Sequence, residues 1–66
     1  MPKTLEELAA MIAERDNISK NEALLAIRDA ASDMEYAFFN GNLDLAETIL
    51  AEDLGLEPDY LDLFIF

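Results

Sequence analysis

The sequence lacks cysteine, histidine and tryptophan, and it has two glycines and two prolines among its 66 residues. Without cysteine there can be no disulfide, and without cysteine or histidine a structural zinc site of the usual kind is also excluded. Small proteins commonly depend on one of these two devices for their stability. This chain must therefore be stabilised by packing of its own apolar residues, which make up 53% of it, or by self-association.

Residues with catalytic chemistry are also scarce. No nucleophile stands at a recognisable spacing from a base, and no glycine-rich phosphate loop is present, because Gly41 and Gly55 fall at expected helix ends. A chain of this length encloses little of a pocket in which the pKa of a carboxyl group could be tuned for acid–base chemistry. We expect that the protein is not an enzyme, and we assign it no catalytic residue, no cofactor and no metal.

Long apolar runs are missing as well. No run approaches the roughly 20 residues that span a bilayer, and residues 1–4 lack the basic and apolar regions of a signal peptide. We expect a cytoplasmic protein that has no membrane partner.

Helix caps and apolar spacing dominate what is present. Thr4 with Glu7 and Ser19 with Glu22 have the spacing of capping boxes, and Asn40-Gly41 and Gly55 are typical helix ends. Sustained alternation of apolar and polar residues, the signal of a strand, is absent. The sequence predicts an all-α fold with a single domain over residues 1–66, a small bundle of three main helices at about 5–16, 19–39 and 43–54, and a short C-terminal helix at about 58–65.

The second of these helices has distinct faces at about 100° per residue. Its predicted core stripe consists of Leu24, Ile27, Ala31, Met34 and Phe38. A neighbouring strip of small residues, on which another helix can lie close, consists of Ala23, Ala26, Ala30 and Ala37.

Charge is unevenly distributed along the chain. Residues 1–28 hold five acids and all four bases, a net charge of −1, whereas residues 29–66 hold ten acids and no base, a net charge of −10, which together give −11. An acidic surface keeps a small protein soluble, and solubility alone is one explanation. The other is a protein partner with a basic surface. Direct binding of nucleic acid is not expected, because the acids repel phosphates.

The predicted partner-binding surface lies on the acidic side of the second helix and on the third. Leu25 and Tyr36 accompany the acids, and the alternative for these two residues is that they pack under a neighbouring helix. The candidate residues are Glu22, Leu25, Asp29, Asp33, Tyr36, Asp44 and Glu47.

The C-terminal segment 60–66 is apolar nearly all round. It is predicted either to fold across the helices as a lid or to form the interface of a homodimer. The candidate interface residues are Tyr60, Leu63, Phe64 and Phe66.

Three segments carry a resemblance. Residues 12–19 (IAERDNIS), 40–46 (NGNLDLA) and 54–61 (LGLEPDYL) are similar to segments of small acidic bacterial proteins encoded by phages and other mobile elements. This resemblance implies a genomic context and no mechanism. Together with the acidic block it leads to one hypothesis, an acidic interaction module that inhibits a host protein by covering its basic, nucleic-acid-binding surface. The alternative is a structural helical module that self-associates and inhibits nothing.

Overall fold

The computed structural model describes residues 2–65, which form three α-helices and one 3₁₀-helix and contain no strand. The elements are α1 (Leu5–Asp16), α2 (Lys20–Phe39), α3 (Leu43–Leu54) and η1 (Pro58–Phe64). The all-α prediction is confirmed, and the boundaries of the three main helices agree with those predicted except that α2 starts at Lys20, one residue later than predicted. The C-terminal helix is a 3₁₀-helix that ends at Phe64, one residue before the predicted end.

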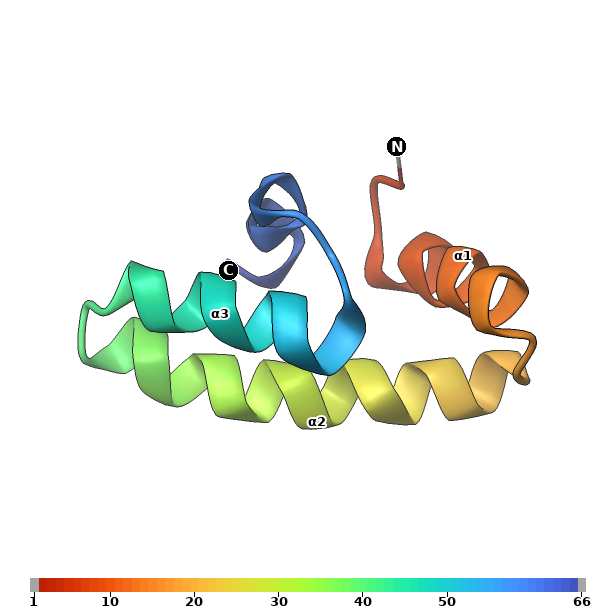
Figure 1. Cartoon of the computed structure of the whole chain (residues 1–66), viewed down its shortest axis with the longest axis horizontal. Coiled ribbons are helices and arrows are strands. Elements are labelled where there is room, and N and C mark those ends of the chain that lie inside the picture. Colours follow the sequence, from red (N-terminus) through yellow and green to blue (C-terminus); the bar gives the residue numbers. More distant parts are fainter. Residues whose placement is uncertain (1, 66) are drawn as a thin grey trace.

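The helices are arranged around α2, which runs along the length of the molecule (Figure 1). α1 and α3 lie one after the other along the same side of α2, and both pack against it. η1 lies over α3, on the side away from α2 (Figure 1). α2 is the longest helix, with 20 residues. In the described part of the chain no helix has both the length and the apolar character needed to cross a membrane.

Side chains cap the start of each α-helix. The Thr4 hydroxyl accepts a hydrogen bond from the Glu7 amide at 3.1 Å, and the Asn42 side chain accepts one from the Leu45 amide at 3.1 Å. At α2 the capping box is complete, because Ser19 accepts from the Glu22 amide while the Glu22 carboxylate accepts from the Ser19 amide. These bonds satisfy amide groups that have no partner within the helix.

Residues in the left-handed conformation follow each α-helix. Asn17, with φ 56°, follows α1, and asparagine tolerates this conformation better than most residues. Gly41, with φ 66°, stands in the short turn between α2 and α3 and makes these two helices antiparallel neighbours. The turn brings the end of α3 back to the middle of α2.

The core is centred on the alanines of α2, which corrects the predicted core stripe. Ala23, Ala30 and Ala37 are fully buried with Ile27 and Met34, whereas three residues of the predicted stripe are half-buried, namely Leu24, Ala31 and Phe38. The physical reason is that alanine lets α1 and α3 come close to α2. The two helices therefore cover the small-residue side, and the side that carries the larger residues stays partly open.

Candidate functional site

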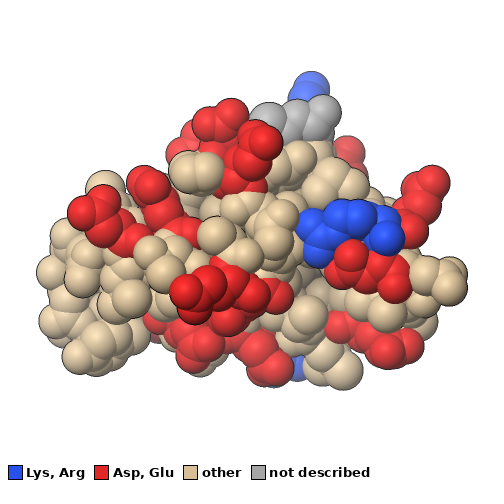
Figure 2. All heavy atoms as spheres, viewed as in Figure 1, with Lys and Arg blue, Asp and Glu red and all other residues tan. Residues whose placement is uncertain are grey.

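The predicted acidic surface is exposed. Glu22, Asp29 and Asp33 are exposed on α2, and so is Asp44 at the start of α3, while Glu47 is half-buried. Figure 2 shows acidic atoms spread across the whole visible face, the α1 side included, whereas few basic atoms are visible and most of them lie toward α1.

The two non-acidic candidates on α2 are also exposed. The exposed fraction is 58% for Leu25 and 69% for Tyr36. No described helix covers either residue, so the alternative that they pack under a neighbour is not what the fold shows. Both are therefore free to contact a partner.

Asp53 of α3 joins two of the predicted acids. The pKa of its carboxyl group is raised, first because burial disfavours the charged form and then because of the charge and a hydrogen bond of Asp33, with smaller effects of Glu52 and Asp29. We call Asp29, Asp33 and Asp53 the acidic cluster. It is built across two helices by the antiparallel turn at Gly41, and the place of Asp53 in it was not predicted.

The acids of residues 29–65 form no ion pair with a base of the described chain. Within residues 2–65 there are two ion pairs, Arg15 with Asp16 and Lys20 with Glu6, and neither includes an acid from residues 29–66. The described residues also hold no group of three or more potential ligands placed to bind a metal ion. The acidic cluster therefore keeps its charge unneutralised within the monomer.

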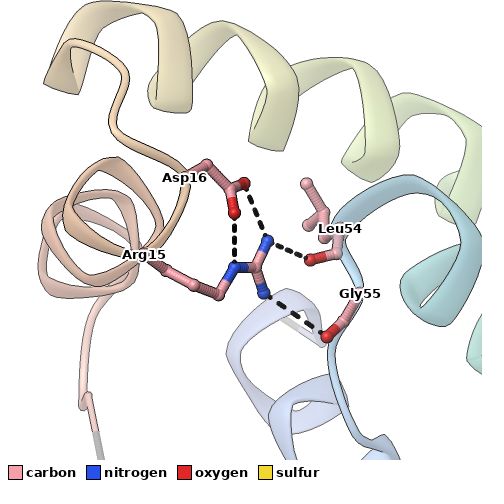
Figure 3. A network of polar contacts seen from close by, with 4 residues as sticks. All are labelled: Arg15, Asp16, Leu54 and Gly55. Atoms are coloured by element: carbon pink, nitrogen blue, oxygen red, sulfur yellow. Dashed lines mark hydrogen bonds and ion pairs between the residues drawn. The ribbon is translucent and has the colours of Figure 1, made fainter.

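Arg15 ties α1 to the end of α3 (Figure 3). Its guanidinium group donates to both carboxylate oxygens of Asp16, at 2.8 and 2.9 Å, and to the backbone carbonyls of Leu54, at 2.7 Å, and Gly55, at 3.4 Å. These carbonyls end α3, which has no basic residue in its own last turn. A cation at this position satisfies helix-end acceptors and interacts favourably with the helix dipole.

The same contacts shift the pKa values of both charged groups. The pKa of Arg15 is raised chiefly by its hydrogen bond to Asp16, and the pKa of Asp16 is lowered chiefly by the same bond. Arg15 is thus a structural base whose ion pair is with Asp16 and not with an acid of residues 29–65.

The C-terminal segment folds over the core as far as it is described. Phe64 is buried, with 3% of its surface exposed, and Tyr60 and Leu63 are half-buried. The Tyr60 hydroxyl lies 3.8 Å from the sulfur of Met11 in α1. Within the monomer these three residues cover the core as a lid, whereas Phe66 lies outside the described residues.

An apolar hollow lies between α2, the start of α3 and the C-terminal end of the described chain. Its lining includes Ala31 and Phe38 of α2, Leu43 of α3, and Phe64 and Ile65 near the C-terminus. Leu43 and Ile65 are each 53% exposed. The hollow was not predicted from the sequence, although Ala31 and Phe38 were singled out as apolar residues of one stripe.

Comparisons with protein-family models, with curated proteins and with solved structures find no match to this chain. The fold and the surfaces together define a small all-α protein with an acidic face and an apolar hollow.

Proposed function

We propose that the protein is an acidic interaction module that binds the basic, nucleic-acid-binding surface of a protein partner. The observation that carries this proposal is the acidic cluster, in which Asp53 of α3 interacts with Asp33 and, more weakly, with Asp29 of α2. Its setting supports the proposal further, because residues 29–66 have a net charge of −10 and contain no base.

The arrangement of the cluster costs stability. Like charges at neighbouring helical positions destabilise a helix by roughly 0.2–0.5 kcal/mol per pair. The pKa of Asp53, raised first by burial and then by Asp33, has the same direction. A basic partner would reverse this cost, because its lysines and arginines would neutralise the cluster. The carboxylates would then occupy the positions that phosphates take on such a surface.

Two exposed side chains add an apolar component. Leu25 and Tyr36 lie on α2 beside Asp29 and Asp33, at spacings that join them into one row along the helix. Tyrosine is among the residues that contribute most to binding energy at interfaces. We expect the acids to set the rate and orientation of association and Tyr36 to slow dissociation.

The inhibitory role of a phage or mobile-element protein is a narrower form of the same proposal. A protein that occupies a nucleic-acid-binding surface excludes the nucleic acid, so inhibition would need no catalysis. A host defence nuclease or regulator has a surface of this kind.

Self-association is the second candidate. Phe39 is 91% exposed at the end of α2 and is available to contact a second copy. The alanine strip is not available for it, because Ala23, Ala30 and Ala37 are covered by α1 and α3. A mass from light scattering that stays monomeric at high micromolar concentration would exclude this candidate.

The test of the proposed function is affinity capture from an extract of the cells of origin. We expect a basic protein to be captured at about 0.05 M salt and released at about 0.5 M salt, where the screening length is much shorter. The variant Asp29→Asn with Asp33→Asn should capture much less of it. The matched control, Glu6→Gln with Glu14→Gln, removes the same number of charges from α1 and should capture as much as the parent; equal losses from both variants would refute a localised site.

A further inference from the structure

Five residues of α2 lie on a face that α1 and α3 leave partly open (Figure 1). They recur at alternating spacings of four and three residues, which places them together on one side of an α-helix. Leu24, Ala31 and Phe38 are half-buried, and Arg28 and Glu35 are exposed. We call these five residues the open face of α2.

The open face has a symmetric pattern about Ala31. Leu24 and Phe38 each stand seven residues from Ala31, or about 10.5 Å along the helix at 1.5 Å per residue. Arg28 stands three residues before Ala31 and Glu35 four residues after it, which corresponds to about 4.5 and 6 Å. The face therefore has a small residue at its centre, opposite charges on the two sides of this residue, and an apolar residue at each end.

This pattern is complementary to itself. Within residues 2–65 neither Arg28 nor Glu35 forms an ion pair. In a two-fold contact between identical chains each residue pair occurs twice, once in either direction. Two α2 helices that cross antiparallel at Ala31 would place Arg28 of each copy beside Glu35 of the other, about 1.5 Å apart along the helix axis. A parallel pair would instead bring like charges together, so charge selects the antiparallel arrangement.

We propose that two copies of the protein form an antiparallel two-fold dimer through the open face of α2. The small side chain of Ala31 lets the two helices approach to the usual distance of about 8–10 Å. Leu24 of each copy then meets Phe38 of the other. At this end the apolar hollow of about 700 Å³, which is also lined by Leu43 and Ile65, receives the side chain of the second copy. These contacts cover apolar surface that the monomer leaves half-exposed.

The net charge weakens the dimer. Each copy carries a net charge of −11, so the two copies repel each other at long range. The interface is also small. We therefore expect a Kd on the order of 100 µM at about 0.15 M salt, where the screening length is about 8 Å. The protein is then monomeric at the low micromolar concentrations of circular dichroism, and the dimer does not contribute to thermal unfolding measured there.

The dimer does not depend on the proposed function. At about 100° per residue, Asp29 and Asp33 each lie about 160° round α2 from Ala31. The acidic cluster therefore faces away from the second copy. The variant Asp29→Asn with Asp33→Asn should dimerise at least as tightly as the parent protein, whatever it captures from an extract.

Charge reversal tests the pairing in sedimentation equilibrium at about 20–500 µM protein, a range that brackets the expected Kd. We expect the mass of the parent protein to rise with concentration. Arg28→Glu or Glu35→Arg alone replaces two contacts of opposite charge by two of like charge and should weaken the dimer at least about tenfold. The matched controls, Lys3→Glu and Glu14→Arg, make the same changes in net charge away from the open face and should change Kd by less than about threefold.

Combining the two reversals should restore the dimer. The double variant has the net charge of the parent protein with the two charges exchanged, and its Kd should return to within about threefold of the parent value. A one-to-one mixture of the two single variants should also associate, because one chain then carries two negative charges on its open face and the other carries two positive charges. This rescue is specific to antiparallel pairing, and it requires that both single variants are folded.

A parent protein that stays monomeric at the highest of these concentrations would overturn the proposal, and so would a dimer that neither single variant weakens. A double variant and a mixture that associate as weakly as the single variants alone, while circular dichroism shows them folded, would contradict the antiparallel pairing.

Discussion

Arg15 holds the end of α1 to the end of α3, and its replacement by glutamine should lower the stability of the whole fold. The guanidinium group donates to the carbonyls of Leu54 and Gly55, which otherwise have no partner at the end of α3 among the described residues. Hydrogen bonds from a charged group contribute about 1.5–3 kcal/mol when they are well shielded. The Arg15 side chain is 39% exposed, so we reduce this to about 1 kcal/mol.

This loss is large for a protein of 66 residues. At roughly 0.05–0.15 kcal/mol per residue its free energy of unfolding is about 3–10 kcal/mol. A loss of about 1 kcal/mol corresponds to a fall in Tm of about 4–8 °C for a domain of this size. The assay is thermal and urea unfolding followed by circular dichroism at pH 7.

Two further variants separate geometry from charge. Arg28→Gln makes the same change in net charge, and Arg28 has no hydrogen bond or ion pair within residues 2–65. Its replacement should therefore change Tm little. Arg15→Lys keeps the charge but loses the planar fork that reaches both carbonyls, so it should fall between Arg15→Gln and the parent protein. Equal losses from Arg15→Gln and Arg28→Gln would refute the bridging role.

Four further predictions concern stability. Asp53→Asn should stabilise the protein at pH 7 by a few tenths of a kcal/mol. The raised pKa of Asp53 gives stability that is fully present below pH 3.8 and is lost as the pH rises through the raised pKa, and the neutral asparagine avoids this loss. A destabilised variant in urea titrations would contradict this. Asp16→Asn should have the opposite sign, since the lowered pKa of Asp16 gives stability that is present above 3.8 and is lost as the pH falls through the lowered pKa, which a pH series of unfolding curves measures. Added sodium chloride should raise Tm by screening repulsion among the acids of residues 29–66, and a fall in Tm with salt would count against that repulsion. Met34→Ala should cost about 2–5 kcal/mol of the free energy of unfolding, whereas Tyr36→Ala should stay within about 0.5 kcal/mol in the same urea assay.

The helix boundaries could be predicted because their signals are local. A cap such as Ser19 with Glu22 acts over three residues, and Gly41 and Gly55 end helices through their own φ values. These interactions hold whatever the rest of the chain does. The sequence therefore contains all the information that the boundaries require.

The core stripe could be predicted only in part, because its centre depends on which neighbour lies over α2. Hydrophobicity favours the side with Leu24 and Phe38, whereas close packing favours the side with Ala30 and Ala37. Close packing of α1 and α3 decides between them. The apolar hollow lined by Ala31 and Phe38 follows from that outcome, so the sequence alone could not predict it either.

The acidic candidates were predicted as far as they share one helix. Asp29 and Asp33 are four residues apart on α2, and the helical repeat alone places them together. Asp53 joins them through the antiparallel turn between α2 and α3, which is a tertiary effect. Counting equal numbers of residues from Gly41, backward along α2 and forward along α3, would have suggested this neighbour.

We propose that the acidic cluster binds a surface of the partner protein that otherwise binds nucleic acid. The most direct measurement is competition, in which the captured partner carries a fluorescently labelled nucleic acid and this protein is titrated into the complex while anisotropy is recorded. We expect that the nucleic acid is displaced and that displacement is lost with Asp29→Asn and Asp33→Asn but kept with Glu6→Gln and Glu14→Gln. Formation of a ternary complex, with the nucleic acid still bound at saturating protein, would contradict it.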